Sequence, residues 1–168
     1  AFDETNGTTA YDSSGNNRNG TLANFDSNTT QWVQGKIGGA LSFDGVNDKI
    51  DVPVSVYPQG SEATVAFWAY GGNLLPKHNT LIYAWANGTA LNIHFTWDDG
   101  NIYWDYGPGT SNEMDNRDRI QKEASASDYK GRWGHWAFRR NQASGVMSIY
   151  LDGAIWHSGS GKTKPAAT

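Results

Sequence analysis

Two short polar stretches of the chain, residues 12–19 and 44–48, are rich in side-chain oxygens. Hard cations such as Ca²⁺ take about six to eight oxygen ligands from carboxylates, amides and backbone carbonyls. The spacing is not that of an EF-hand, and Asp, Asn and Gly in such stretches also form Asx turns. Both interpretations stay open for the donors offered here, which are Asp12, Asn16, Asn17, Asn19, Asp44, Asn47 and Asp48.

A second candidate site lies in the aromatic-rich region 83–106. Aromatic rings can stack on the C–H faces of sugars while a few polar groups fix the hydroxyls. Period-2 alternation places Asn92 and His94 on one face of their strand, opposite Leu91, Ile93, Phe95 and Trp97. In the next strand, Tyr103 and Asp105 alternate with Ile102, Trp104 and Tyr106.

The polar face of these two strands is predicted to line a groove. Two arginines of the following long segment are expected to overhang it. Tryptophan in a β-sandwich is commonly a core residue, which is the competing interpretation for the rings. The predicted ligand-binding set is Asn92, His94, Tyr103, Trp104, Asp105, Arg117 and Arg119.

The composition indicates an all-β protein without disulfides. The 168 residues include 20 Gly, eight Trp and eight Tyr but no Cys, and runs of strong helix formers are scarce. The net charge of −4 and the pI of about 5.4 come without a basic stripe, so nucleic acid is not an expected partner. Because no apolar run approaches ~18 residues, no membrane span is expected.

Short strands separated by turns predict a two-sheet antiparallel sandwich or jelly roll, as one domain over residues 1–168. The central stretch, 37–52, reads as a strand, a tight turn and a strand, with 40–44 paired to 48–52. Residues 63–70 read as a strand buried on both faces. Residues 107–131 form the longest insertion without strand character. Further strands are expected at 81–86, 90–97, 101–106, 133–140, 146–151 and 154–158.

Five motifs in order resemble a laminin-G-like domain of the concanavalin A-like lectin/glucanase superfamily. They are the Tyr11-Asp-Ser-Ser-Gly-Asn loop, the Gly35-Lys-Ile-Gly-Gly-Ala-Leu-Ser-Phe-Asp-Gly segment, Ala66-Phe-Trp, Gly131-Arg-Trp-Gly-His-Trp-Ala-Phe and Ile149-Tyr-Leu-Asp-Gly. The resemblance covers about residues 1–158 and implies a two-sheet jelly roll. Such domains usually continue for about 40–50 residues beyond the last motif, so the chain resembles a domain without its C-terminal strands.

The resemblance also implies a structural calcium ion near the edge of the fold. By that likeness, the expected ligands are Asp12, Asn17, Asn19 and Asp44. The Glu-x-Asp-x-x-Glu strand of the glucanases on this fold has no counterpart here. Glycoside hydrolysis needs two carboxylates about 5–9.5 Å apart, and Asp98 and Asp99 fall in a turn. No catalytic residues and no enzyme activity are therefore expected.

The expected function is a non-catalytic carbohydrate-binding module of a secreted or cell-surface protein, with a polysaccharide or glycoconjugate glycan as partner. The composition suits a bacterial domain within a larger multidomain protein. The alternative is an adhesive or structural spacer that binds protein or no ligand. A glycan-active enzyme is the third and least favoured hypothesis.

Overall fold

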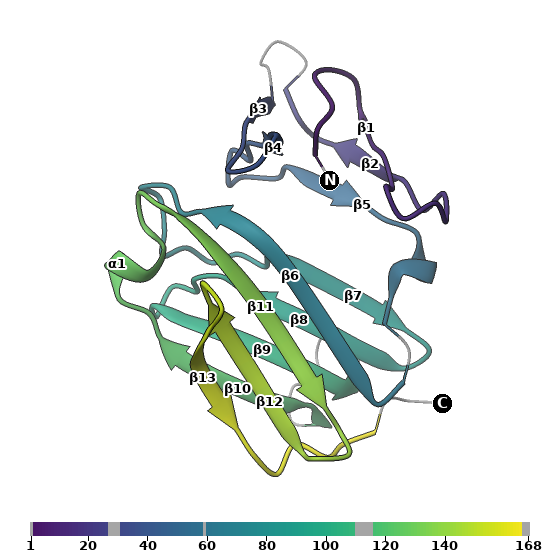
Figure 1. Cartoon of the computed structure of the whole chain (residues 1–168), viewed down its shortest axis with the longest axis vertical. Helices are drawn as coiled ribbons and strands as arrows, with labels where there is room; N and C mark the ends of the chain where they lie inside the picture. The colour runs from purple at the N-terminus through teal and green to yellow at the C-terminus, as the bar shows by residue number, and fades with distance from the viewer. Residues whose placement is uncertain (1, 27–30, 59, 110–115, 166–168) are drawn as a thin grey trace. The chain divides into compact units, whose positions relative to one another are not determined.

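The structure, a computed structural model, describes residues 2–26, 31–58, 60–109 and 116–165 (Figure 1). The chain divides into two compact units, Ala1–Val56 and Tyr57–Thr168. Nearly all regular structure is strand. The described residues contain one α-helix, α1 (Ala126–Tyr129), and one 3-10 helix, η1 (Val54–Val56).

The first unit consists of short strands around a small apolar core. The strands β1 (Thr9–Ala10), β2 (Gly20–Ala23) and β5 (Lys49–Asp51) form an antiparallel sheet in the order β1-β2-β5. A separate hairpin joins β3 (Trp32–Gln34) to β4 (Gly39–Leu41). The buried apolar residues of this unit are Ala10, Leu22 and Trp32.

The prediction that residues 40–44 pair with 48–52 is wrong. Strand β4 pairs with β3, with Val33 opposite Ala40, whereas β5 pairs with β2, with Leu22 opposite Ile50. The turn before β4 explains the first pairing, because Gly38 has a φ of 65° and accepts a hydrogen bond from Gly35 N–H at 2.9 Å. Apolar alternation thus located the strands but did not identify their partners.

The second unit contains two four-stranded antiparallel sheets. Sheet I has the order β13-β12-β11-β6, with strands β6 (Glu62–Tyr70), β11 (Trp133–Asn141), β12 (Val146–Leu151) and β13 (Ala154–Gly159). Sheet II has the order β10-β9-β8-β7, with strands β7 (Ile82–Ala86), β8 (Thr89–His94), β9 (Asn101–Pro108) and β10 (Asp118–Glu123). Figure 1 shows sheet I lying in front of sheet II.

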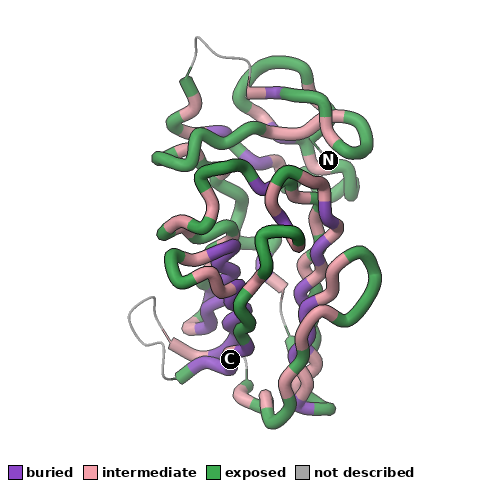
Figure 2. Tube along the Cα trace, turned by 90° about the vertical axis from the view of Figure 1, so that its left-hand side faces the viewer, coloured by how far each residue is buried: buried purple, intermediate pink, exposed green. Residues whose placement is uncertain are grey.

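The main core fills the space between the two sheets of this unit. Leu91, Ile93 and Trp104 of sheet II pack in one cluster with Trp136 and Phe138 of sheet I. Figure 2 shows buried residues recurring along the strands of both layers. The predicted two-layer antiparallel all-β architecture is confirmed.

Two details of the second unit differ from the predictions. Residues 63–70 were expected to be buried on both faces, but β6 is an edge strand whose outward side chains, Trp68 and Tyr70, are exposed. The insertion 107–131 was expected to lack strands, but it contains β10, which pairs with β9 with Ile120 opposite Trp104. Asp118–Glu123 contains a single apolar residue, Ile120, so the sequence has no alternation there that would have predicted the strand.

Candidate functional site

The outer face of sheet II gathers five of the seven predicted ligand-binding residues. Asn92 and His94 lie on β8, Tyr103 and Asp105 on β9, and Arg119 on β10. The register places Asn92 opposite Asp105 and Asp105 opposite Arg119, while His94 is opposite Tyr103. These five residues, called the polar face below, therefore form two adjacent rows across the sheet.

The row of three residues is centred on an ion pair. Arg119 donates to both carboxylate oxygens of Asp105, through Nε at 2.5 Å and through a terminal nitrogen at 2.6 Å. The Arg119 guanidinium also lies 4.7 Å from the centre of the Tyr103 ring. The hydrogen bonds to Asp105 raise the pKa of Arg119.

His94 is held in a hydrogen-bonded network beside this pair. Its Nδ1 lies 3.0 Å from Thr80 Oγ1 and 3.1 Å from the carbonyl oxygen of Asn79. Its Nε2 lies 3.0 Å from Asn92 Nδ2. Burial lowers the pKa of His94, so the neutral ring fits: Nδ1–H donates to the Asn79 carbonyl and Nε2 accepts from Asn92.

Tyr103 connects the polar face to the turn before β9. Its hydroxyl donates to Asp99 Oδ2 at 2.5 Å, and Asn101 N–H donates to Asp99 Oδ1 at 2.9 Å. The hydrogen bond from Tyr103 lowers the pKa of Asp99, and burial together with that bond raises the pKa of Tyr103 to about 12. Asp99 is therefore an ionised acceptor and Tyr103 a protonated donor at neutral pH.

Trp97 does not lie where alternation predicted it. It was expected to share the apolar face of Leu91 and Ile93, but β8 ends at His94. Beyond that end, the Trp97 ring contacts two imidazoles, with centroid distances of 3.8 Å to His78 and 4.3 Å to His94. Period-2 reasoning failed here because it holds only within a strand.

Two aromatic residues omitted from the predicted set, Tyr83 and Trp85, complete this face. They lie on the edge strand β7, and both residues are 50% exposed. Tyr83 is opposite Asn92, and Trp85 is opposite Ala90. The signal was available in the sequence, because these rings alternate with Ile82 and Ala84, which pack against the core.

Trp104 and Arg117 lie apart from the polar face. Trp104 is opposite Ile93 and Ile120, is 0% exposed, and packs in the core between the sheets. Its Nε1 donates to the Arg139 carbonyl at 3.3 Å. Arg117 precedes β10 and is buried, and its carbonyl accepts a hydrogen bond from Lys164 Nζ at 3.0 Å. A ligand on the polar face would not contact Trp104.

The polar stretch 12–19 uses its oxygens within the loop itself. Asp12 accepts from Ser14 N–H and from Ser14 Oγ–H at 2.8 Å, and from Arg18 N–H at 2.9 Å. These bonds lower the pKa of Asp12 to about 2. Asn19 Oδ1 accepts from Asp12 N–H at 2.9 Å, and Asn17 Oδ1 accepts from Asn19 Nδ2 at 3.3 Å. This is the Asx-turn alternative.

The fourth predicted calcium ligand, Asp44, lies at the opposite end of β2. Asp12 N–H donates to Asn19, which precedes the first residue of β2, Gly20. The 44–48 turn lies at the other end of the strand, where the Asn47 carbonyl accepts from Asn24, the residue after Ala23. Asn19 and Asn24 are five residues apart, which corresponds to roughly 17 Å in an extended strand that rises about 3.3 Å per residue. The four residues therefore do not fit one ion. The described ranges also contain no cluster of three or more His, Cys, Asp or Glu arranged for a metal.

The comparisons with known proteins agree with this architecture. The family model Laminin_G_3, described as the concanavalin A-like lectin/glucanases superfamily, matches residues 44–168. A crystal structure of a tryptophan-to-alanine mutant of HCR/D superposes with a TM-score of 0.63 at 20% identity, over 98% of this chain and 39% of that chain. At that identity the likeness shows the fold alone, and this chain spans about two fifths of that one.

No curated protein matches the sequence. Within the described residues, no helix has the length and apolar character needed to cross a membrane. The family model and the superposition together confirm the jelly-roll sandwich. Because the family model matches well over half of the chain, this protein belongs to the concanavalin A-like lectin/glucanases superfamily.

Proposed function

We propose that this protein is a non-catalytic carbohydrate-binding module that holds a polysaccharide or glycoconjugate glycan on the polar face. Membership in the superfamily supports a binding module in general. The observation that carries the proposal is the half-exposed pair Tyr83 and Trp85, which share a sheet face with the row Asn92, Asp105 and Arg119. Exposed rings on β7 would stack on a sugar. Beside them Arg119, the partly exposed member of the polar face, would bond the sugar hydroxyls, while the buried Asp105 holds Arg119 in place.

The state of the two carboxylates near this face supports binding rather than hydrolysis. A glycosidase needs a carboxylic acid with a raised pKa to protonate the leaving group. Asp99 has a lowered pKa because it accepts the Tyr103 hydroxyl hydrogen bond. Both oxygens of Asp105 are engaged by Arg119. Asp99 is therefore not set up as a general acid, and Asp105 is occupied by its ion pair with Arg119.

The remaining context belongs to the same proposal. We infer a secreted or cell-surface protein, since glycans of this kind are found outside the cell. Placement within a larger multidomain protein is part of the same proposal. Calcium is not included, because the four predicted ligands lie at two ends of β2.

The test is a glycan-array screen followed by affinity gel electrophoresis on each polysaccharide that gives a signal. The variant Tyr83→Ala/Trp85→Ala should weaken retention by at least about tenfold, as expected when central aromatic contacts are truncated. Because both side chains are half exposed, the melting temperature should change little.

A matched control is available on the other sheet. Trp68 and Tyr70 also lie two residues apart on an edge strand and are 39% and 54% exposed. The variant Trp68→Ala/Tyr70→Ala should keep full retention. Equal loss in both variants, or no retention of the unmodified protein on any polysaccharide, would contradict the proposed site.

The exposed residues used as the control, Trp68 and Tyr70, favour a second candidate function. This function is an adhesive or structural module that binds protein. On the outer face of sheet I, Trp68 packs edge-on to His135 with centroids 5.2 Å apart, and Tyr70 to Trp133 at 5.7 Å. His135 is partly exposed here. Exposed aromatic clusters of this kind are enriched at protein interfaces.

The two functions predict different phenotypes for the same pair of variants. If the module is adhesive, Trp68→Ala/Tyr70→Ala should abolish attachment of protein-coated beads to the purified domain, and Tyr83→Ala/Trp85→Ala should leave it intact. On glycan-coated beads, loss of attachment with Tyr83→Ala/Trp85→Ala and full attachment with Trp68→Ala/Tyr70→Ala would support carbohydrate binding.

A further inference from the structure

The sequence contains three Asn-Gly pairs, each followed by threonine: Asn6-Gly7, Asn19-Gly20 and Asn87-Gly88. In such a pair the backbone nitrogen of the glycine can attack the amide carbon, Cγ, of the asparagine. Glycine favours this attack because it has no Cβ and adopts backbone conformations closed to other residues. The attack also needs an asparagine side chain that can turn and a glycine backbone that no sheet or turn holds. The three pairs differ in both respects.

The pair Asn19-Gly20 is held at its side chain and at its backbone. Asn19 Oδ1 accepts from Asp12 N–H at 2.9 Å, and Asn19 Nδ2 donates to Asn17 Oδ1 at 3.3 Å. Gly20 is buried at the start of β2, where it pairs with Ala10. These hydrogen bonds would have to break before the Gly20 nitrogen could reach Asn19 Cγ. The fold therefore protects this pair.

The pair Asn87-Gly88 forms the two-residue turn between β7 and β8. Both residues have a positive φ, 49° for Asn87 and 73° for Gly88, as a type I′ hairpin turn requires. Ala86 and Thr89 pair across the base of the turn, and the Gly88 carbonyl accepts from Gly109 N–H at 3.0 Å. Bringing the Gly88 nitrogen onto the Asn87 side chain would require this turn to open. The hairpin therefore slows the reaction here.

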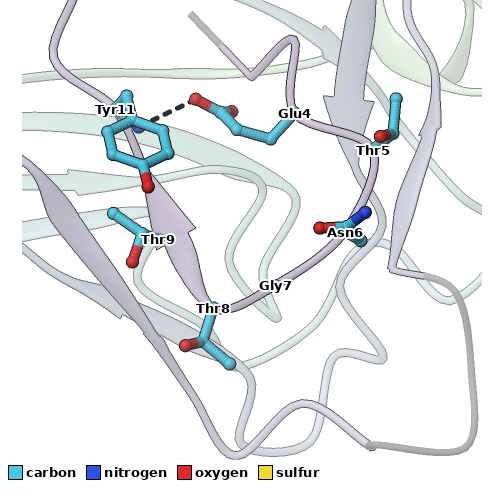
Figure 3. A pocket seen from close by; sticks show the side chains of 7 residues that line it. All are labelled: Glu4, Thr5, Asn6, Gly7, Thr8, Thr9 and Tyr11. Atoms are coloured by element: carbon cyan, nitrogen blue, oxygen red, sulfur yellow. Dashed lines mark hydrogen bonds between the residues drawn. The ribbon is translucent and has the colours of Figure 1, made fainter.

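The pair Asn6-Gly7 has neither restraint. Both residues are exposed and lie outside the strands. Within the ranges that the structure describes, neither the Asn6 amide group nor the Gly7 N–H has a hydrogen-bond partner. Figure 3 shows both residues in the loop that lines a hollow of about 310 Å³, which leaves the Asn6 side chain room to turn. We propose that Asn6 is a site of spontaneous deamidation.

The reaction at Asn6 needs water and no other reactant. The Gly7 nitrogen loses its proton to the solvent and bonds to Asn6 Cγ, and the Cγ–Nδ2 bond breaks to release ammonia. Water then adds to one carbonyl of the cyclic imide and reopens it. Cleavage between the nitrogen and Cγ gives aspartate, whereas cleavage at the backbone carbonyl gives isoaspartate. The net change is an amide and water converted to a carboxylic acid and ammonia, without oxidation or reduction.

Conversion to isoaspartate should loosen the small core of the first unit. The Gly7 carbonyl accepts from Trp32 Nε1 at 3.0 Å and from Gln31 Nε2 at 3.3 Å. Isoaspartate at position 6 adds a backbone atom directly before Gly7 and so displaces this carbonyl. Because Trp32 is one of the few buried apolar residues of this unit, loss of its bond to Gly7 should weaken the packing around it.

The test is incubation of the whole chain in mildly alkaline buffer, followed over time by peptide mapping with mass spectrometry. Asn6 should convert at least about tenfold faster than Asn19 and Asn87, because the other two pairs must first break hydrogen bonds. In urea the three sites should convert at similar rates, since each lies in the same tripeptide, Asn-Gly-Thr. Conversion of Asn19 or Asn87 as fast as Asn6 in the folded protein would overturn the proposal. The same rate differences in urea would overturn the role of the fold.

Two matched variants test the effect on the first unit. Asn6→Gln should prevent the early conversion, because the larger imide ring of glutamine forms more slowly, and Asn87→Gln should leave it unchanged. After ageing, the indole N–H signal of Trp32 should shift in the unmodified sequence and in Asn87→Gln but not in Asn6→Gln. An unshifted Trp32 signal after full conversion of Asn6 would overturn the inferred loosening of the core. None of these measurements depends on glycan binding.

Discussion

The ion pair between Asp105 and Arg119 makes the polar face sensitive to a single substitution. Asp105 is 1% exposed, so its carboxylate depends on Arg119 for compensation, whereas the Arg119 side chain is 31% exposed and keeps some contact with water. Arg119→Met should reduce the free energy of unfolding by about 2–4 kcal/mol, because it leaves a buried charge unpaired. Urea denaturation followed by tryptophan fluorescence measures the change.

The double variant Asp105→Leu/Arg119→Met supplies the control. Removing both charges should recover most of the lost stability, since a buried pair replaced by apolar groups is often nearly neutral. If the double variant is less stable than Arg119→Met, the two side chains stabilise the protein by more than neutralising each other's charge, and the prediction is wrong.

The pKa of Asp12 leads to a prediction about how the protein responds to low pH and to metal removal. Its folded pKa of about 2 lies below the ordinary value of 3.8, because Arg18 N–H and the Ser14 groups donate to the carboxylate. The contribution of Asp12 to the free energy of unfolding is therefore fully present above about pH 4 and is lost as pH falls through about 2. Carboxyl-carbon NMR should show this midpoint.

A melting experiment at neutral pH, with and without excess EDTA, separates hydrogen bonding from metal binding at Asp12. The described loop satisfies Asp12 by hydrogen bonds, so chelation should not change the melting temperature of the protein. A melting temperature that drops on adding EDTA would instead show that a cation contributes to this loop.

At the scale of elements, the two faces of sheet II should respond differently to truncation of tryptophan. Trp104 faces the core from the middle of β9, and Trp85 faces outward on β7. Trp104→Ala should cost about 3–5 kcal/mol of unfolding free energy through the cavity it leaves. Trp85→Ala should cost less than about 1 kcal/mol while weakening glycan retention. Equal costs would contradict the assignment of the two faces.

These two tryptophans also show what sequence reasoning could and could not establish. Alternation correctly separated Trp104 from Asp105, yet Trp104 was still placed in the ligand set, because ring chemistry was weighed without burial. Strand positions were predictable from period-2 patterns, as with Val146–Leu151. Strand partners were not, because β4 and β5 have equally good patterns for several pairings. The grouping of the four predicted calcium ligands met the same limit: their nearness to turns in the sequence did not show which end of β2 each turn occupies.

At the scale of the whole molecule, the two units differ greatly in the apolar core that each contains. The second unit has an extensive cluster that includes Trp104, Trp136 and Phe138, whereas the first unit buries only Ala10, Leu22 and Trp32 among its described apolar residues. Since stability grows with the apolar surface buried, the first unit should open at a lower free energy than the second. Amide hydrogen exchange should therefore be faster at Leu22 and Trp32 than at Ile93 and Phe138.

Native-state exchange across a urea series tests this order. Amides of β2 and β3 should exchange through an opening of lower free energy, and those of β8 and β11 only through global unfolding. Trp32→Phe, which weakens the small core and removes the bond to Gly7, should accelerate the first group without changing the second. If Trp32→Phe lowers protection of Ile93 and Phe138 equally, the chain unfolds as one cooperative unit, and the smaller core is stabilised by more than its own buried residues.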